Sequence, residues 1–280
     1  MRLHLRQASN FAIYYGFGAL DQLESYEVVV LHPGAHSKAD IQRLKDHNTI
    51  PLAYLSLGED GESKNSSSQD IQSWWKPSQD GVIQQNPEFG SYIVDPAHPE
   101  WQKRVLENAK TSLELGFRGF FLDTLDSSDE ADQLALAKLI IKLRAKFPQI
   151  ALVLNRGFRV LARVAPIVDG ALFEGLSTTW KLQPDGTVKY FQLEVDMRTA
   201  NEHVARYILS WAEQLGFARW ALDYADQPKL EAFAKNEAQK LGFVSFTSNW
   251  QLLQIKDLVK AKKTQSRVTK KQPFWKKFRI

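Results

Sequence analysis

Two acidic residues stand directly after apolar segments and are spaced so that they could act as a pair. The run 120–122 (Phe-Phe-Leu) precedes Asp123, and the pair 172–173 (Leu-Phe) precedes Glu174. Carboxylates at the end of a buried segment are rarely left without a use or a partner. Cleavage of a glycosidic bond generally needs two carboxylates, one to protonate the leaving oxygen and one to attack the sugar carbon or to activate water. Asp123 and Glu174 are therefore candidates for this chemistry.

The same side chains permit other interpretations. Asp123, Asp126 and Glu174 could supply oxygen ligands to a divalent metal in a metal-dependent hydrolase. Asp126 could instead orient Asp123, bind a substrate or cap the following helix. A third interpretation is a carbohydrate-binding protein that uses the same residues without turnover. The residue types alone leave these three alternatives open.

The segments around the two acids alternate between strand and helix. Apolar runs predict eight main strands, over residues 11–16, 27–32, 50–57, 117–123, 150–154, 170–173, 218–222 and 243–247, with a short extended piece at 91–94. Helical patterns fall between them, over residues 20–26, 38–47, 101–115, 130–146 and 228–240, with a further helix that follows Gly157 and ends at Val164. Residues 58–90 are the least regular part. A repeated strand–helix unit is typical of a parallel α/β sheet.

Polar residues accumulate after the predicted strands, which favours a barrel over an open sheet. They are Glu59, Asp95, Asp123, Asp126, Asn155, Glu174, Asp223 and Asn249. A closed barrel can direct the ends of many strands to one mouth, whereas an open doubly wound sheet concentrates its site at one switch point. The sequence therefore predicts a single-domain α/β protein with a (β/α)₈ TIM barrel over residues 1–258.

Aromatic residues near the predicted strand ends suggest a carbohydrate ligand, because sugar rings stack on aromatic faces. They are Tyr14, Tyr15, Tyr54, Trp180, Tyr224 and Trp250. Ordinary core packing would account for some of them equally well. Trp74 and Trp75 lie in the polar segment 58–90, where burial is less automatic.

The charge of the chain is divided between an acidic body and a basic end. Residues 259–280 carry nine Lys and Arg and no acid, and without them 27 basic residues face 32 acidic ones, a net charge of −5. We expect residues 259–280 to form a basic tail for which an anionic surface is a candidate contact, with no specific nucleic acid as partner. The chain has no cysteine, so no thiolate can act as a nucleophile or a zinc ligand. The first 17 residues lack the apolar core of a signal peptide.

Several motifs together resemble glycoside hydrolase family 114, whose members include endo-α-1,4-polygalactosaminidases and which is similar to the hydrolase domain of the Pel exopolysaccharide system. The motifs lie in the order Tyr-Gly at 15–16, Ala-Tyr-Leu-Ser-Leu-Gly-Glu at 53–59, Asp-Pro at 95–96, Phe-Leu-Asp-Thr-Leu-Asp at 121–126 and Phe-Glu-Gly at 173–175. The resemblance covers roughly residues 11–250. Residues 92–96 depart from the pattern that often precedes the fourth strand in this family.

The resemblance implies a retaining, endo-acting barrel glycosidase with Asp123 as nucleophile and Glu174 as general acid/base. The implied substrate is a cationic, partly deacetylated galactosaminoglycan, an exopolysaccharide of biofilms, and no metal or cofactor is expected. The substrate-binding residues that we predict are Tyr15, Tyr54, Glu59, Asp95, Asp126, Asn155, Trp180, Tyr224 and Trp250. We expect a monomer. The resemblance suggests an extracellular or periplasmic protein, and because no signal peptide is visible the compartment stays open.

Overall fold

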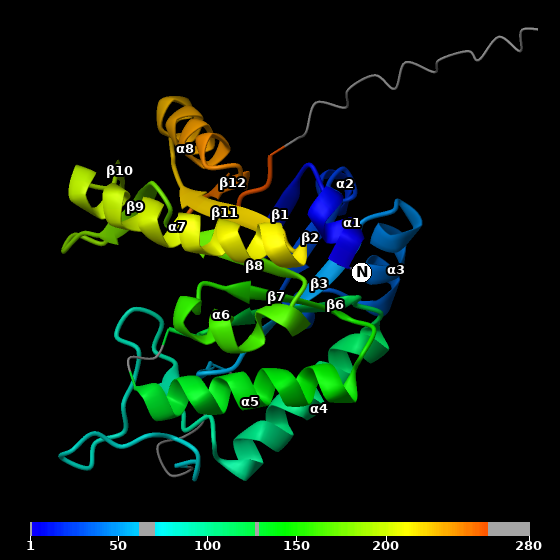
Figure 1. The fold of residues 1–280 in the computed structure, drawn as a ribbon, viewed down its shortest axis with the longest axis vertical. Helices are drawn as coiled ribbons and strands as arrows, with labels where there is room; N and C mark the ends of the chain where they lie inside the picture. The colour runs from blue at the N-terminus through cyan, green and yellow to red at the C-terminus, as the bar shows by residue number, and fades with distance from the viewer. Residues whose placement is uncertain (1, 62–70, 127–128, 257–280) are drawn as a thin grey trace, which may run out of the picture.

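The computed structural model describes residues 2–61, 71–126 and 129–256, and eight of its strands form one parallel sheet (Figure 1). In the order in which they neighbour one another, these are β1 (Phe11–Tyr14), β2 (Val28–Leu31), β3 (Ile50–Ser56), β6 (Gly119–Asp123), β7 (Ala151–Asn155), β8 (Gly170–Glu174), β11 (Ala218–Tyr224) and β12 (Val244–Ser248). Every hydrogen-bonded pair of neighbours is parallel. The sheet curls into a nearly closed barrel, so the predicted (β/α)₈ fold is confirmed.

Helices cover the outside of the barrel (Figure 1). Six of them overlap the predicted segments, namely α2 (Leu20–Leu23), α3 (Lys38–Asp46), α4 (Pro99–Leu115), α5 (Glu130–Lys146), α6 (Phe158–Val164) and α8 (Pro228–Lys240). Two short 3-10 turns, Pro33–Ala35 and Ala165–Ile167, lie in the connections. The pattern of residues also explains the helix ends: Ser37 and Asp40 form a capping box at the start of α3, and Pro99 opens α4.

Helices α1 (Arg2–Gln7) and α7 (Val195–Leu215) and strands β4 (Glu59–Asp60), β9 (Thr178–Leu182) and β10 (Val188–Gln192) were not predicted from the sequence, and the three strands lie at the barrel mouth. Helix α1 precedes the barrel, and α7 follows the hairpin of β9 and β10. Strand β4 pairs with β5 (Tyr92–Ile93), which the extended piece at 91–94 anticipated. The β9–β10 hairpin and residues 71–98 lie at the same end of the barrel, on the left in Figure 1. These insertions therefore surround the ends of β3 and β8.

The barrel closes between β1 and β12 through side chains. Within the described residues no backbone ladder joins these two strands. Instead, the Phe11 ring stacks on Trp220 with centroids 4.7 Å apart and lies 5.7 Å from the ring of Phe246. The Tyr15 amide also donates to the Leu252 carbonyl at 2.9 Å. Buried aromatic packing thus takes the place of strand pairing at this seam.

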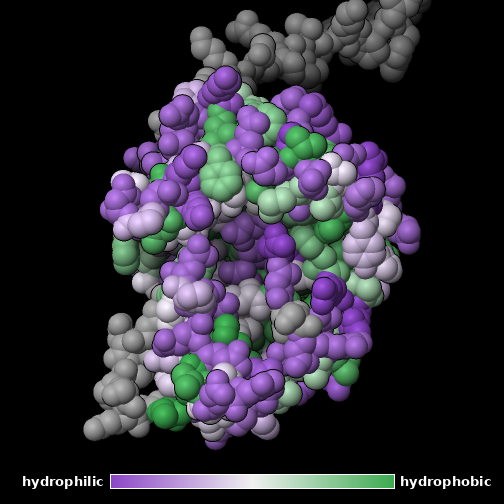
Figure 2. All heavy atoms as spheres, turned by 90° about the vertical axis from the view of Figure 1, so that its left-hand side faces the viewer, coloured by the Kyte–Doolittle hydropathy of each residue, from purple (hydrophilic) through white to green (hydrophobic). Residues whose placement is uncertain are grey.

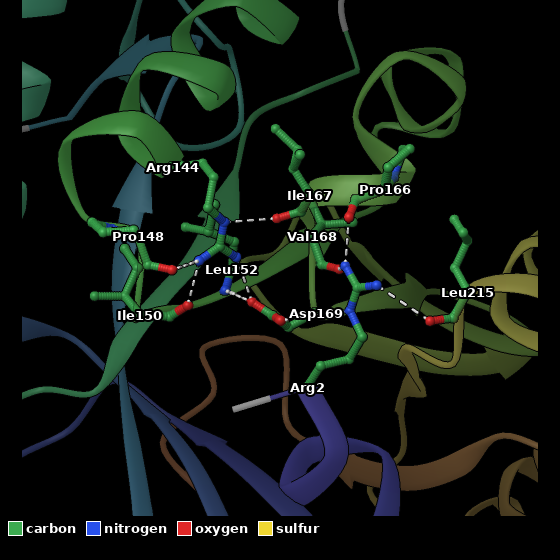
Figure 3. A network of polar contacts seen from close by, with 10 residues as sticks. All are labelled: Arg2, Arg144, Pro148, Ile150, Leu152, Pro166, Ile167, Val168, Asp169 and Leu215. Carbon is green, nitrogen blue, oxygen red and sulfur yellow. Dashed lines mark hydrogen bonds and ion pairs between the residues drawn. The ribbon is translucent and has the colours of Figure 1, made fainter.

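A polar network closes the barrel at the opposite end, where the strands begin (Figure 3). Asp169, just before β8, accepts a 2.6 Å hydrogen bond from Arg144 of α5 and a 2.9 Å bond from the Leu152 amide. Arg144 also donates to three backbone carbonyls, those of Pro148, Ile150 and Ile167. Arg2 of α1 lies 3.7 Å from Asp169 and donates to carbonyls of residues 166, 168 and 215. Together these hydrogen bonds hold α1, α5 and β8 against one another.

The expected basic tail, residues 259–280, and the boundary at residue 258 lie outside the described residues. None of the helices in the described ranges is long and apolar enough to cross a membrane.

Candidate active site

The carboxylates of Asp123 and Glu174 are joined through one amide nitrogen. Asp123 ends β6, Glu174 ends β8, and Asn155 ends β7 between them. Asn155 Nδ2 donates to Asp123 Oδ1 at 2.7 Å and to Glu174 Oε2 at 2.6 Å. Because both oxygens bond to the same nitrogen, they lie within about 5.5 Å of each other, the range in which retaining glycosidases hold their two carboxyl groups. The structure thus brings the two predicted acids together across β7.

Tyrosine hydroxyls complete the polar surroundings of both acids. Tyr224, at the end of β11, donates a hydrogen bond to Glu174 Oε1. Tyr54 of β3 donates to the Asp123 carboxylate from the other side, and the ring of Tyr15 lies 5.2 Å from the ring of Tyr54. Burial raises the pKa of all three tyrosines well above the ordinary value, and the nearby carboxylates raise it further. These hydroxyls therefore stay protonated, and those of Tyr54 and Tyr224 act as donors to the acids.

The surroundings of Asp123 favour its protonated form. Desolvation, and after it the charge of Glu174, raise the pKa of Asp123 to about 6. Hydrogen bonds from the Thr124 amide, Asn155 and Tyr54 act in the opposite direction because they favour the ionised form.

The backbone after β6 is locked to the end of β3. Thr124 adopts a positive φ of 61°, and its Oγ1 accepts hydrogen bonds from the amides of Leu57 and Gly58 at 3.1 and 2.7 Å. A Cβ on Gly58 would lie 2.2 Å from the Thr124 carbonyl oxygen, so only glycine permits this approach. The lock fixes the residue that follows Asp123.

A buried aspartate holds the turn after β8 in a similar way. Asp223 of β11 is fully buried, and its Oδ1 accepts hydrogen bonds from the amides of Ser177 and Thr178 at 2.8 and 2.7 Å. Burial raises the pKa of Asp223 to about 6. Gly175, directly after Glu174, turns the chain with a φ of 67°. Asp223 therefore positions the segment that carries Glu174 and the β9–β10 hairpin.

Three predicted substrate-binding acids have hydrogen-bond partners within the protein. Asp126 pairs with Arg156 at 2.5 Å and accepts from the Gly157 amide, while Arg156 also donates to the Glu174 carbonyl at 2.9 Å. Asp126 does not cap α5, because Asp129 does so. Glu59 accepts hydrogen bonds from Asn86 and Ser91.

Asp95 closes a turn before α4 by accepting from the Ala97 amide at 2.8 Å. No contact between Asp95 and the acid pair is present in the described ranges. The role of these three acids in substrate binding stays a prediction.

Aromatic residues form two groups on either side of the acid pair. The first group consists of Tyr15, Tyr54 and His32, whose ring centroids lie 5.2 to 6.5 Å apart. In the second group Trp180 of β9 lies 4.9 Å from Trp250 and 6.4 Å from Tyr224. Tyr190, opposite Trp180 in the hairpin, accepts a hydrogen bond from the Trp250 amide. Viewed from the mouth, the centre of the molecule is hollowed and lined mainly by hydrophilic residues (Figure 2).

Sequence reasoning missed several residues at this mouth. Tyr190 belongs to the unpredicted hairpin, and Phe89, whose ring lies 6.4 Å from Trp180, sits in the irregular segment 58–90. Arg156 directly follows Asn155 and could have been found as a basic residue at a strand end. Trp74 and Trp75 are buried, and both donate to the buried Asp60, so they hold the segment rather than line the mouth.

No group of three or more histidine, aspartate or glutamate side chains is placed to hold a metal ion within residues 2–61, 71–126 and 129–256.

A ring of eight parallel strands with an acid pair at the strand ends and aromatic groups beside it defines the class of barrel-fold glycoside hydrolases. The profile of glycoside-hydrolase family GH114 matches residues 3–204. The chain therefore belongs to this family and is a glycoside hydrolase.

Solved structures share this fold. The glycoside hydrolase domain of PelA from Pseudomonas aeruginosa is 27% identical and superposes with a TM-score of 0.74, covering 88% of this chain and 97% of that one. Ega3 from Aspergillus fumigatus, solved in complex with galactosamine, is 12% identical with a TM-score of 0.65, covering 89% and 95%. The second likeness concerns the fold alone.

Among curated proteins, an uncharacterized protein of Methanocaldococcus jannaschii is 33% identical over 99 residues. That alignment spans 33% of this chain and 26% of the relative. The chain thus matches about a quarter of the length of this relative.

Proposed function

We propose that this protein is a retaining, endo-acting hydrolase of a cationic, partly deacetylated galactosaminoglycan. In this proposal Asp123 is the nucleophile and Glu174 the general acid/base. The observation that carries it is the Asn155 amide, which holds the two carboxylates at a separation suited to double displacement. Asn155 would keep both acids in place through the reaction.

The reaction would proceed in two steps on the pair. First, protonated Glu174 donates its proton to the glycosidic oxygen while ionised Asp123 attacks the anomeric carbon, so the C–O bond to the leaving sugar breaks as a glycosyl–Asp123 ester forms. Then Glu174, now ionised, takes a proton from water, which attacks the same carbon and releases Asp123. Hydrogen bonds from Asn155 and Tyr54 stabilise the ionised nucleophile, and Tyr224 orients Glu174.

The charge and the aromatic groups of the mouth support the choice of substrate. Glu59, Asp123 and Glu174 stand near one another at the strand ends, while the nearby Arg156 is engaged by Asp126 and a backbone carbonyl. A polymer that carries ammonium groups is attracted to such a surface. The resemblance to glycoside hydrolase family 114, whose members include endo-α-1,4-polygalactosaminidases, supports an amino sugar. The Trp180 and Tyr54 groups provide faces for sugar rings.

The test is hydrolysis of galactosaminoglycans of graded acetylation, measured as the release of reducing ends. We expect Asp123→Asn and Glu174→Gln each to lower kcat by roughly 10²- to 10⁴-fold, and the first product to keep the α configuration by NMR. Internal cleavage would give mixed oligosaccharides from the start. The control is Glu107→Gln on the exposed face of α4.

Near-wild-type hydrolysis by either acid variant contradicts the assignment. Saturable binding of the polymer without reducing-end release would favour the carbohydrate-binding interpretation. Loss of activity with EDTA and its return with a divalent metal would favour the metal-dependent one.

A further inference from the structure

Residues 86–91 form a short strap between the loop after β3 and the hairpin after β8. At one end Asn86 Nδ2 donates to both oxygens of Glu59, at 3.2 and 3.3 Å, and the Ser91 hydroxyl donates to the same carboxylate. At the other end the Phe89 ring meets Trp180 edge to face. In the sheet, β6 and β7 stand between β3 and β8. The strap therefore connects the two sides of the strand ends that carry Asp123 and Asn155.

The strap has a defined shape because its own hydrogen bonds fold it. Asn86 Oδ1 accepts from the amides of Glu88 and Phe89, at 3.0 and 3.3 Å. The Asn86 amide donates to the Ser91 carbonyl, and the Gly90 amide donates back to the Asn86 carbonyl, both at 2.8 Å. Gly90 supports the turn with a φ of 68°. Asn86 thus places residues 88 and 89 together at the mouth.

Glu88 is a carboxylate at this mouth. Within the described residues it forms no ion pair, and the charge of Glu174 acts on it. Burial and that repulsion both raise the pKa of Glu88 above its ordinary value. A positive group that arrives with the ligand would stabilise a negative charge held in this position.

Among the described residues, three basic side chains near this end are occupied or turned away from the mouth. Arg156 is engaged with Asp126 and the Glu174 carbonyl. Lys181 and Lys189 stand opposite each other in the β9–β10 hairpin, one position from the Trp180–Tyr190 pair. Because successive side chains of a strand point to opposite faces, the two lysines lie on the face away from Trp250 and Tyr224. The hairpin directs its aromatic rings toward the mouth and its positive charge away from it.

We infer that Glu88 is a specificity-determining residue that recognises the ammonium group of a deacetylated hexosamine unit bound beside Glu174, with the ring of that unit held against Phe89 and Trp180. This inference rests on the proposed function. An N-acetyl group at the same place carries no charge and would leave Glu88 unpaired next to Glu174, so the enzyme would discriminate against acetylated units there. Recognition at one carboxylate would let the enzyme distinguish amine from amide at a defined position of the polymer.

The experiment measures hydrolysis by the full-length protein of two α-1,4-linked galactosamine oligosaccharides of equal length, one fully deacetylated and one fully N-acetylated. We expect Glu88→Gln to lower kcat/KM for the deacetylated oligomer by about tenfold or more, and to change kcat/KM for the acetylated one by less than about twofold. Glu107→Gln, an exposed acid on α4, should change neither. Phe89→Ala should lower kcat/KM for both oligomers to a similar extent, because stacking of the sugar ring does not depend on the amine.

Equal losses on both oligomers, or no loss on either, in Glu88→Gln overturn the assignment of Glu88. Unchanged kinetics in Phe89→Ala overturn the stacking contact. A binding measurement separates this inference from the proposed function. If the wild type hydrolyses neither oligomer, the hydrolase proposal fails, and calorimetry on Asp123→Asn with and without Glu88→Gln still decides the inference. Selective loss of affinity for the deacetylated oligomer supports it, and equal affinity of the two variants overturns it.

Discussion

At the scale of single residues, Asn155 determines what the acid pair can do. Both acids receive a hydrogen bond from its Nδ2, and its Oδ1 is buried with no partner within the described residues. The amide can therefore serve either acid in its ionised form, because each presents an acceptor oxygen to a donor nitrogen. Glu174 also accepts from Tyr224, and Asp123 from Tyr54, so each acid has a second donor of its own.

The raised pKa of Asp123 gives a prediction about stability. An aspartate whose pKa is about 6 in the folded chain and near 3.8 when unfolded costs nothing below pH 3.8, where both states are protonated. Between these values the unfolded chain ionises first, so stability falls as pH rises and the full cost applies above pH 6. At pH 7 the free energy of unfolding of Asp123→Asn should therefore exceed that of the wild type by up to about 3 kcal/mol, and the variant should unfold at a higher temperature.

The measurement is thermal unfolding of both proteins at pH 4 and pH 7. We expect the unfolding temperature of Asp123→Asn to exceed that of the wild type at pH 7, and the difference to be small at pH 4. Asp126→Asn is a suitable control, because Asp126 is half exposed and paired with Arg156. A gain of equal size at both pH values would mean that the charge of Asp123 is not its cause.

Residues that follow a regular strand could be predicted to share a site, whereas those of the irregular segment could not. Asp123, Asn155 and Glu174 each come directly after an apolar run, and a parallel sheet places such positions at one end. Glu88 and Phe89 reach the same mouth only because Asn86 folds their loop. Such a contact depends on tertiary hydrogen bonds rather than on a local pattern.

At the scale of elements, the strands were easier to predict than the hairpin. Most residues of the barrel strands are buried, so their apolar runs stand out against the helices around them. The β9–β10 hairpin is half exposed and mixes aromatic, charged and polar residues, so its pattern resembles a loop. Helix α1 was missed because only six residues form it and just Leu5 is buried.

The network at the closed end of the barrel joins α5 to the loops before β7 and β8, and its loss should affect stability alone. Arg144 pairs with Asp169 and satisfies three backbone carbonyls. Arg144→Ala would remove a donor from each of these carbonyls and leave the mostly buried Asp169 with only the Leu152 amide and Arg2 beside it, so we expect unfolding to become easier by roughly 2–5 kcal/mol. Because the network lies at the end opposite the mouth, activity per folded molecule should stay unchanged.

Chemical denaturation and initial rates at a temperature where both proteins are folded check this expectation. Lys138→Ala, on the exposed face of the same helix α5, is the matched control and should change neither quantity. A fall in kcat of Arg144→Ala without loss of stability would show that the closed end influences the mouth.

At the scale of the whole molecule, charge and shape both distinguish the mouth. The body of the chain is net acidic once residues 259–280 are set aside, and acids of several strands stand at one end. The fold could be predicted because eight strand–helix units in about 240 residues fit few other architectures. The residues at which the barrel would close could not be predicted, because ring closure joins the two ends of the chain.

The seam between β1 and β12 makes the barrel unequal around its circumference. Backbone hydrogen bonds join seven pairs of neighbouring strands. Between β1 and β12 the contact is instead made by the rings of Phe11 and Phe246, and nearby the Tyr26 hydroxyl donates to the Lys256 carbonyl. Amides of β1 and β12 that point into the seam should therefore exchange with deuterium at least about tenfold faster than those of β6 and β7, since their local opening breaks no ladder. Uniform protection around the ring would contradict this, and faster exchange would identify the seam as the least protected part of the barrel wall.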